Sequence, residues 1–271
     1  MRHLIPGLLA AALALAGMAQ TQTLDDGLFK LETADDARGW DAVGKLIMGK
    51  HGFCTGALIG PQLVLTAAHC LYDKTTGVQM RPEEMEFQAG FRNGRAVAYR
   101  SVTRAVTHPD YRYGATDKLD RVSGDLALLE LSQPIRLPSL EPFQTGAAPV
   151  QGDPVGVVSY AQYREQAPSI QEACEVLADE RQALILTCNV DFGSSGAPVF
   201  TFENGVARVV SVISAKAEVD GRKVAVAVPL AEPLIALRAA LEDSRAESAG
   251  GARAVSVISG GTGAGAKFVR P

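Results

Sequence analysis

The chain has few of the features that mark several large classes of protein. Only 21% of its 271 residues are charged, the formal net charge is −4, and lysine and arginine are scattered rather than clustered. It therefore lacks the basic patch that nucleic-acid binding requires. With 47% hydrophobic residues, the chain is too apolar to be mostly disordered and long enough to bury a substantial core. We expect a globular monomer with no nucleic-acid partner.

Long apolar runs are also scarce, and the one candidate lies at the N-terminus. Arg2 and His3 precede the apolar run 4–16, and Gly17 and Ala19 provide the small residues that signal peptidase reads. The alternative is a membrane anchor, but the run is shorter than the roughly 20 residues that span a bilayer. Residues 1–19 are therefore predicted to be a signal peptide. We expect the mature protein to be periplasmic or secreted, with no membrane span.

Cysteine is rare and divided evenly along the chain. Cys54 and Cys70 lie in the first half, and Cys174 and Cys188 lie in the second. Pairing within each half is the simplest of the three possible connectivities. Four free thiols are the alternative, which export to an oxidising compartment disfavours, and the spacing lacks the usual patterns of zinc ligands. The sequence implies no metal and no cofactor.

Short apolar runs separated by turn residues dominate the chain from Val43 onward. Such β-branched runs predict an all-β sandwich or barrel. Residues 20–42 before them are polar and are predicted to form a flexible arm or a propeptide. The runs occupy residues 56–59, 63–67, 85–89, 96–106, 126–131, 155–160, 183–190, 206–213 and 223–228.

Two later segments complete the organisation. The stretch 133–152 contains four prolines, as expected of a linker between two lobes. Leucines spaced three or four residues apart predict an amphipathic helix over residues 230–242. Residues 243–271 are rich in glycine, alanine and serine and are predicted to be a flexible tail.

Histidine is scarce enough to narrow the search for a general base. After the predicted signal peptide only His51, His69 and His108 remain. His69 follows small residues in the sequence TAAHC, 66–70, which leaves space around its imidazole. The alternative for a lone histidine is a buried side chain that bonds backbone carbonyls. His108, before a proline, is interpreted as structural, and His51 as a solvated loop residue.

Two further motifs contain a hydroxyl and a carboxylate. The sequence GSSGAP, 193–198, places glycines on both sides of Ser195, which allows amide N–H groups to point together at a developing oxyanion. In SGDLALL, 123–129, Asp125 stands at the mouth of an apolar strand, where a buried carboxylate needs a partner such as an imidazole. Each motif alone could be an ordinary turn. Their joint occurrence in the order His, Asp, Ser is much more specific.

With these motifs the chain resembles the chymotrypsin/trypsin-like serine peptidases, from about residue 43 to residue 242. The resemblance implies two six-stranded Greek-key β-barrels, over about 43–137 and about 150–228, closed by the C-terminal helix. It also implies a catalytic triad of His69, Asp125 and Ser195 and an oxyanion hole formed by Gly193 and Ser195. Cys54 and Cys70 match the disulfide that brackets the catalytic histidine. The substrate-binding residues it implies are Asn189, Val190, Ser214, Ala215 and Lys216.

The chain departs from the family pattern before the nucleophile. Members activated by clipping carry an aspartate there, which binds the new N-terminal ammonium, whereas this chain has Ser194. A hydroxyl cannot balance a buried ammonium, so we predict that this activation is absent. The arm also lacks the usual Ile-Val-Gly-Gly start. Both departures indicate the bacterial branch related to glutamyl endopeptidases and suggest that removing residues 20–42 leaves Ser195 competent.

The implied function is a secreted serine endopeptidase acting on protein or peptide substrates through an acyl-enzyme. The alternative is a catalytically silent relative that binds peptides in the same groove. Asn189 is expected near the base of the primary pocket, where there is no acid to select Lys or Arg, so a small or medium uncharged side chain is predicted. Lys216 replaces a usual glycine and could narrow the groove or attract an acidic side chain.

Overall fold

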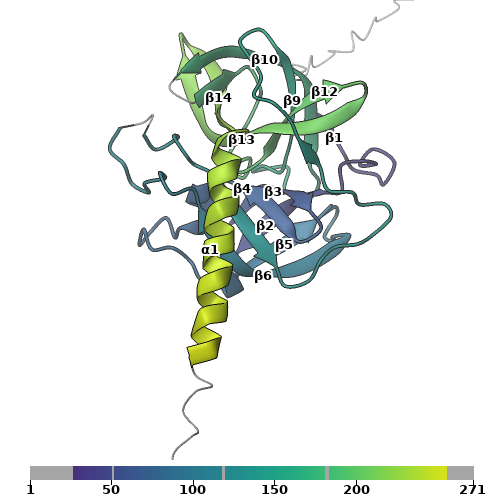
Figure 1. Cartoon of the computed structure of the whole chain (residues 1–271). Helices are drawn as coiled ribbons and strands as arrows, with labels where there is room; N and C mark the ends of the chain where they lie inside the picture. The colour runs from purple at the N-terminus through teal and green to yellow at the C-terminus, as the bar shows by residue number, and fades with distance from the viewer. Residues whose placement is uncertain (1–26, 51, 118–119, 181–182, 255–271) are drawn as a thin grey trace, which may run out of the picture.

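The computed structural model describes residues 27–50, 52–117, 120–180 and 183–254, with side chains described as far as residue 249. The predicted signal peptide, His51 and residues 255–271 of the predicted tail lie outside these ranges. Two β-barrels stack on one another, and one long helix runs alongside (Figure 1). This arrangement confirms the expected all-β, chymotrypsin-like fold class.

The first barrel closes in the order β2-β3-β4-β7-β6-β5, with antiparallel neighbours. In β5 alternate side chains are buried, and Met85, Phe87 and Ala89 lie in the core. Its strands are β2 (Val43–Met48), β3 (Phe53–Gly60), β4 (Leu63–Thr66), β5 (Met85–Ala89), β6 (Ala98–Thr107) and β7 (Ala127–Leu131). Two 3₁₀ turns, η1 (Ala68–Leu71) and η2 (Pro82–Glu84), interrupt them.

The second barrel closes because β10 pairs with both β9 and β11. Its strands are β9 (Pro154–Ser159), β10 (Ser169–Glu180), β11 (Ala183–Leu186), β12 (Pro198–Glu203), β13 (Val206–Val219) and β14 (Arg222–Pro229). Two short strands attach to it: β1 (Phe29–Lys30) pairs with β10, and β8 (Gln144–Thr145) pairs with β13. Each barrel contains one of the expected disulfides, Cys54–Cys70 in the first and Cys174–Cys188 in the second.

Three long strands, β2, β10 and β12, lie outside the apolar runs identified in the sequence. In β10 the buried residues are interrupted by Glu172, Glu175 and Asp179, and β12 begins at a proline. These segments form strands because they pair with neighbouring strands, and their own sequence has no clear apolar pattern.

Residues 27–42 do not form a flexible arm, so that prediction is wrong for this part of the chain. Leu31, Ala37 and Ala42 are each at most 2% exposed. Trp40 packs against Phe143 and Phe200, with ring centroids 6.0 Å and 5.1 Å apart. Contrary to the expectation from the sequence, removing residues 20–42 should therefore destabilise the fold, because it exposes these core contacts.

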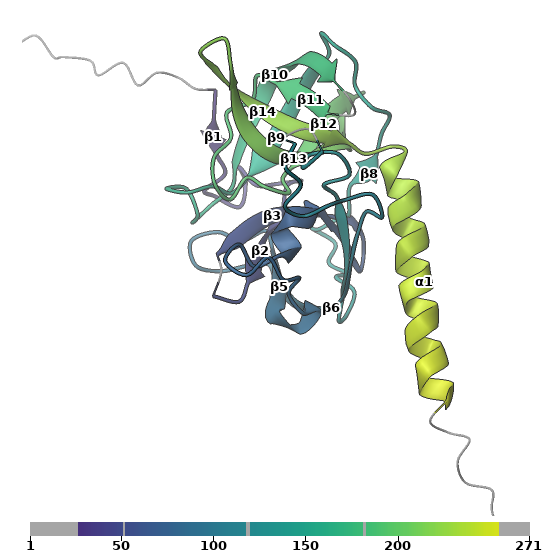
Figure 2. The ribbon, with the colours of Figure 1, turned by 90° about the vertical axis from the view of Figure 1, so that its left-hand side faces the viewer.

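The C-terminal helix α1 (Pro233–Ala254) starts later and ends much later than predicted. Leu234, Leu237 and Leu241 are buried as expected, but the helix continues for twelve residues past Glu242. It lies along the first barrel against β6 and β7 and extends beyond it (Figure 2). The predicted flexible tail is therefore wrong for residues 243–254. Within the described residues, no helix combines the length and the apolar character that crossing a membrane requires.

Polar contacts explain why the helix does not stop at its last leucine. Arg104 of β6 donates to Ser244 O at 2.8 Å, and Arg245 donates to Glu130 of β7. Burial alone would raise the pKa of Glu130, but the hydrogen bonds from Arg245 and Arg104 outweigh it and lower the pKa. These partners come from distant strands, so they leave no periodic signal in the helix sequence.

Candidate active site

His69 lies in the 3₁₀ turn η1, directly after strand β4. Ala67 and Ala68 before it are fully buried, and Cys70 after it is bonded to Cys54 of β3. The small residues pack close under the turn while the disulfide ties it to the barrel. The imidazole is thereby held at the surface of the first barrel, with 22% of its side chain exposed.

Asp125 is 1% exposed and is bound to His69 at two points. Its Oδ2 lies 2.7 Å from His69 Nδ1, and its Oδ1 accepts the His69 backbone N–H at 2.8 Å. Ser214 Oγ donates to the same Oδ2 at 2.5 Å. A buried carboxylate needs such partners. The arrangement fixes the ring with Nδ1 toward Asp125 and leaves Nε2 for a reacting group.

His108 supports the aspartate segment rather than the reaction. It is 9% exposed, and its backbone N–H donates to Leu126 O at 2.9 Å. A Cβ added to Gly124, which has φ +66°, would lie 3.0 Å from His108 Nδ1. Burial lowers the pKa of this imidazole. Its packing agrees with the structural interpretation made from the sequence.

Ser195 comes from the second barrel and is packed against the first. Its carbonyl accepts the Thr55 N–H at 2.8 Å. The next residue, Gly196, has no room for a side chain, because an added Cβ would lie 2.1 Å from Thr66 Oγ1 and 3.0 Å from Ala67 N. Gly196 N also donates to Ile213 O at 2.7 Å, one residue before the serine that binds Asp125. The three predicted catalytic segments therefore meet where the barrels touch.

The hydroxyl of Ser195 has no hydrogen-bond partner among the described residues. In particular, no hydrogen bond joins it to His69 Nε2, which lies 3.8 Å from Cys70 Sγ. Catalytic hydrogen bonds are often long before substrate binds. Ser195 itself is partly exposed.

The backbone around Ser195 presents two amide groups that nothing in the described chain accepts. Phe192 O accepts Gln162 N–H at 2.7 Å, and Ser194 O accepts Ala197 N–H at 2.9 Å. In a trans peptide the N–H points opposite to the C=O. The N–H groups of Gly193 and Ser195 therefore point away from these internal partners. Free amide donors beside a nucleophile are what an oxyanion hole requires.

Gly193 can adopt this conformation only because it lacks a side chain. Its φ is +96°, and an added Cβ would lie 2.4 Å from the ring of Phe53 and 3.2 Å from Ala161 Cα. The sequence suggested the glycine, but the Phe53 ring and the residue 160–164 loop that enclose it could not be located from the sequence.

The predicted substrate-binding residues are only partly brought together. Ser214 is buried against Asp125, and Ala215 and Val190 are half-buried beside it in the second barrel. Asn189 is exposed, and its N–H donates to Gln171 Oε1 at 2.7 Å. Its place near the base of the primary pocket therefore stays a prediction.

Lys216 is bound to Asp191, four residues before Ser195. Its Nζ lies 2.6 Å from Asp191 Oδ1 and 3.9 Å from the centre of the Phe192 ring. The hydrogen bond from Lys216 lowers the pKa of Asp191 below its ordinary value. The ion pair links the segment before Ser195 to strand β13. Opposite charges 25 residues apart give no signal from which this contact could be predicted.

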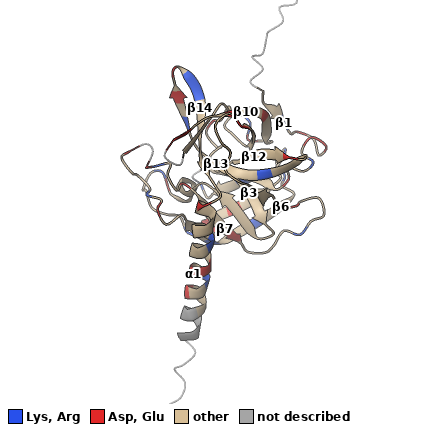
Figure 3. Ribbon diagram, turned by 45° about the horizontal axis from the view of Figure 1, so that its top comes forward, with Lys and Arg blue, Asp and Glu red and all other residues tan. Residues whose placement is uncertain are grey.

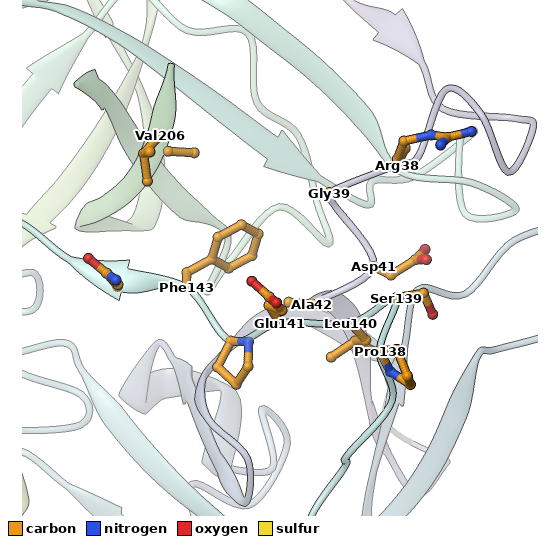
Figure 4. A pocket seen from close by; sticks show the side chains of 13 residues that line it. Arg38, Gly39, Asp41, Ala42, Pro138, Ser139, Leu140, Glu141, Phe143 and Val206 are labelled. Carbon is orange, nitrogen blue, oxygen red and sulfur yellow. The ribbon is translucent and has the colours of Figure 1, made fainter. Parts of the chain in front are cut away.

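Two other features of the described residues do not add to the site. Cys54, His69 and Cys70 lie close enough to share a metal, but both cysteines are in a disulfide and offer no thiolate. A hollow of about 410 Å³ lies between the N-terminal arm, the inter-barrel linker and the β12–β13 hairpin (Figure 4). It is lined by Arg38, Asp41, Glu141 and Phe143, among others, and by none of the predicted site residues. Basic and acidic residues are mixed over both barrels in the view of Figure 3.

Comparison with known proteins relates this site to one family. Residues 54–210 match the model of the trypsin-like peptidase domain. A glutamyl endopeptidase of Bacillus licheniformis is 29% identical over 157 residues, which are 57% of this chain and 47% of that protein. A trypsin of Phaedon cochleariae is 37% identical over 90 residues, 32% of this chain and 30% of that protein. The matched regions thus span less than half the length of these relatives.

A solved structure of a Glu endopeptidase in complex with MPD has the same fold. It superimposes with a TM-score of 0.65 at 18% identity, over 80% of this chain and 97% of that chain. The family match includes the segments that carry His69, Asp125 and Ser195. By this match and by its two-barrel fold, the chain belongs to the trypsin-like peptidase family and is related to the glutamyl endopeptidases.

Proposed function

We propose that this protein is a secreted serine endopeptidase that cleaves protein or peptide substrates through an acyl-enzyme, acting as a monomer. One observation carries the proposal. A buried Asp125 bonded to a partly exposed His69 lies where the barrels meet, beside a serine loop whose hydroxyl and two amides have no partner in the described chain. The carboxylate and the imidazole already bond each other, so their geometry is fixed. The hydroxyl and the amides of the loop remain available to a substrate carbonyl.

The proposed reaction begins with attack by Ser195 Oγ on the scissile carbonyl. His69 Nε2 takes the hydroxyl proton as the C–O bond forms, and Asp125 stabilises the resulting imidazolium through Nδ1–H. The negative charge on the carbonyl oxygen is accepted by the N–H groups of Gly193 and Ser195. The C–N bond then breaks as His69 returns the proton to the leaving amine.

Hydrolysis of the acyl-enzyme repeats these steps with water. His69 removes a proton from the water that attacks the ester carbonyl, and the second tetrahedral intermediate expels Ser195 Oγ, which regains its proton from the imidazolium. The same donors bind the oxyanion in both halves of the reaction. No cofactor or metal takes part in this proposal.

Export is proposed from the disulfides and from the N-terminal sequence. The described chain has no free cysteine, and its two disulfides are of the kind that persists in oxidising compartments. With residues 1–19 as a signal peptide, the mature protein would act in the periplasm or the medium.

The proposed specificity is for a small or medium uncharged side chain before the cut bond. Lys216 is already paired with Asp191 and covers the Phe192 ring, so it narrows the groove and is less available to an acidic substrate. The described residues that flank this place, Val190 and Ala215, are apolar. A strong preference for Lys or Arg in a peptide library would overturn this part of the proposal.

Labelling with a fluorophosphonate tests the function directly. We expect the purified mature protein to gain the mass of one phosphonyl group, and the modified peptide to contain Ser195. Ser195→Ala should lose the label, whereas the control Ser132→Ala, at an exposed serine, should keep it. A correctly folded protein that stays unlabelled would instead be a silent relative that binds peptides.

A further inference from the structure

Ser194, which replaces the aspartate of clipped relatives, is a fully buried hydroxyl in a dense polar network. Its Oγ donates to Tyr160 O at 3.3 Å or Ser159 Oγ at 3.2 Å, and it accepts the Asp191 N–H at 3.3 Å. No residue of the described arm, 27–42, is among its partners. Within the oxyanion loop, residues 191–195, Ser194 is therefore held by groups of the second barrel, while Thr55 of the first barrel bonds the carbonyls of Gly193 and Ser195.

Arg164 supplies the positive charge at this place. Its guanidinium donates to Ser159 O at 2.9 Å, to Ser159 Oγ at 3.1 Å and to Ser194 Oγ at 3.5 Å. The group thus bridges the end of strand β9 and the residue before the nucleophile. A guanidinium is suited to this because its donors are fixed in a planar fork and it remains charged at any ordinary pH.

The loop that carries Arg164 also fixes the peptide that precedes Gly193. Gln162 N–H holds Phe192 O at 2.7 Å, and Arg164 N–H closes the turn on Ala161 O at 3.0 Å. Tyr163, between them, has φ +68°, a left-handed conformation that costs energy in a tyrosine. If the turn relaxed, the Phe192–Gly193 peptide would lose its internal partner and could rotate its N–H away from the substrate.

We propose that Arg164 is a positioning residue that holds the oxyanion loop in its donating conformation, so that the site forms without an N-terminal ammonium. The guanidinium fastens Ser194 to Ser159, and the same turn directs the N–H of Gly193 outward through Gln162. The inference rests on the proposed peptidase function for its kinetic consequences only. The structural consequence, an ordered loop, does not depend on turnover.

Kinetics of Arg164→Ala and Arg164→Lys test the role. Loss of an oxyanion donor outright costs about 10²- to 10³-fold in kcat, so a loosened donor should cost about 10- to 100-fold in Arg164→Ala with KM within about threefold. Arg164→Lys keeps the charge but not the fork and should lose about fivefold, because an ammonium holds fewer of the three acceptors in place. Arg38→Ala is the control, since that guanidinium is 81% exposed and pairs with Asp35.

Two inhibitors and one additive separate positioning from general damage. A peptide aldehyde, which forms a tetrahedral adduct, should lose affinity in parallel with kcat, whereas a cleaved-product peptide should bind as before. Guanidinium chloride at millimolar concentration should restore part of the kcat of Arg164→Ala, and ammonium chloride should not. A kcat within about threefold of the wild type would overturn the inference, and so would equal losses of aldehyde and product binding.

Hydrogen exchange gives a test that survives failure of the proposed function. In Arg164→Ala the amides of Ser194 and Ala197, which are bonded within the loop, should exchange at least tenfold faster, while those of β4 stay protected. Unchanged exchange in the loop would overturn the inference even in an active enzyme. If Arg164→Ala does not fold, Arg164→Lys provides the test. A wild-type kcat and wild-type amide exchange in that variant would contradict a role for the planar guanidinium. If fluorophosphonates do not label the wild-type protein, the proposed peptidase function is refuted, but the positioning role of Arg164 is not.

Discussion

The two halves of the site differ in how completely their polar groups are bonded. In the first barrel, both carboxylate oxygens of Asp125 and the Nδ1 of His69 are engaged, and the aspartate is 1% exposed. In the loop of the second barrel, the hydroxyl of Ser195 and the amides of Gly193 and Ser195 have no acceptor or donor in the described chain. Hydrogen bonds fix the geometry of the bonded half. The open half keeps its donors and its hydroxyl available for a substrate.

The largest effect is expected from disturbing the bonded half, by Asp125→Asn. The amide cannot accept from His69 Nδ1–H and the backbone N–H in the same way, so the imidazole is held in the wrong tautomer. We expect kcat to fall by about 10⁴-fold at neutral pH. Asp35→Asn, at a carboxylate that is 86% exposed and remote from the site, is the matched control and should leave kcat unchanged. An Asp125→Asn variant with less than a tenfold loss would show that Asp125 does not orient the base.

A smaller effect is expected in the open half, from Gly193→Ala. The new methyl collides with the Phe53 ring at a positive φ, so the N–H of residue 193 should leave the oxyanion position. We expect kcat to fall by about 10²- to 10³-fold, which steady-state kinetics with an ester substrate would measure. Gly94→Ala controls for backbone strain, because Gly94 also has a positive φ but nothing lies near its added Cβ. If both variants behave alike, the Gly193 amide does not stabilise the transition state.

An intermediate link between the halves is the hydroxyl of Ser214, which reaches Asp125 from strand β13. Ser214→Ala removes one hydrogen bond to a buried charge, so kcat should fall about tenfold with little change in KM. Ser211→Ala is the control on the same strand, because its hydroxyl bonds Val228 O at 2.7 Å and is remote from the aspartate's partners. It should lower the melting temperature and leave kcat unchanged. If Ser214→Ala keeps the wild-type kcat, the Ser214 hydroxyl does not support Asp125 in the reaction.

The smallest effect is expected at the entrance to the groove, from Lys216→Ala. The Asp191–Lys216 pair is about half exposed, and such pairs contribute at most about 1 kcal/mol. Breaking it should shift kcat/KM toward larger uncharged side chains by about two- to fivefold in a peptide library. Lys223→Ala, at an exposed site further along the β13–β14 hairpin, should leave the profile unchanged. A selective loss of substrates with acidic side chains would mean instead that Lys216 binds them.

Local motifs were enough to select the segments that the fold brings together at the candidate site. The sequence around His69, Asp125 and Ser195 specifies small residues, a strand entrance and a glycine turn, and these are short-range properties. The disulfides also followed from their placement along the chain. The positions of several strands could be anticipated from apolar runs that stand between turn residues.

Long-range partners explain what the sequence analysis missed. Residues 27–42 are mostly polar in sequence, yet Leu31 is buried and Trp40 packs against Phe200 of the second barrel. The last turns of α1 are bonded to Arg104 and Glu130, and the apolar periodicity of the helix does not reveal these contacts. Arg164 likewise acts on Ser194 thirty residues away. Such contacts depend on the completed fold, so periodicity and local motifs could not reveal them.

A crystal structure of the fluorophosphonate adduct would test the central claim most directly. The account predicts phosphorus bonded to Ser195 Oγ and one phosphoryl oxygen about 2.7–3.1 Å from both Gly193 N and Ser195 N. It also predicts His69 Nε2 on the leaving-group side, with the Asp125 contacts unchanged. An adduct whose phosphoryl oxygen contacts neither amide, or whose His69 ring has left Asp125, would contradict it.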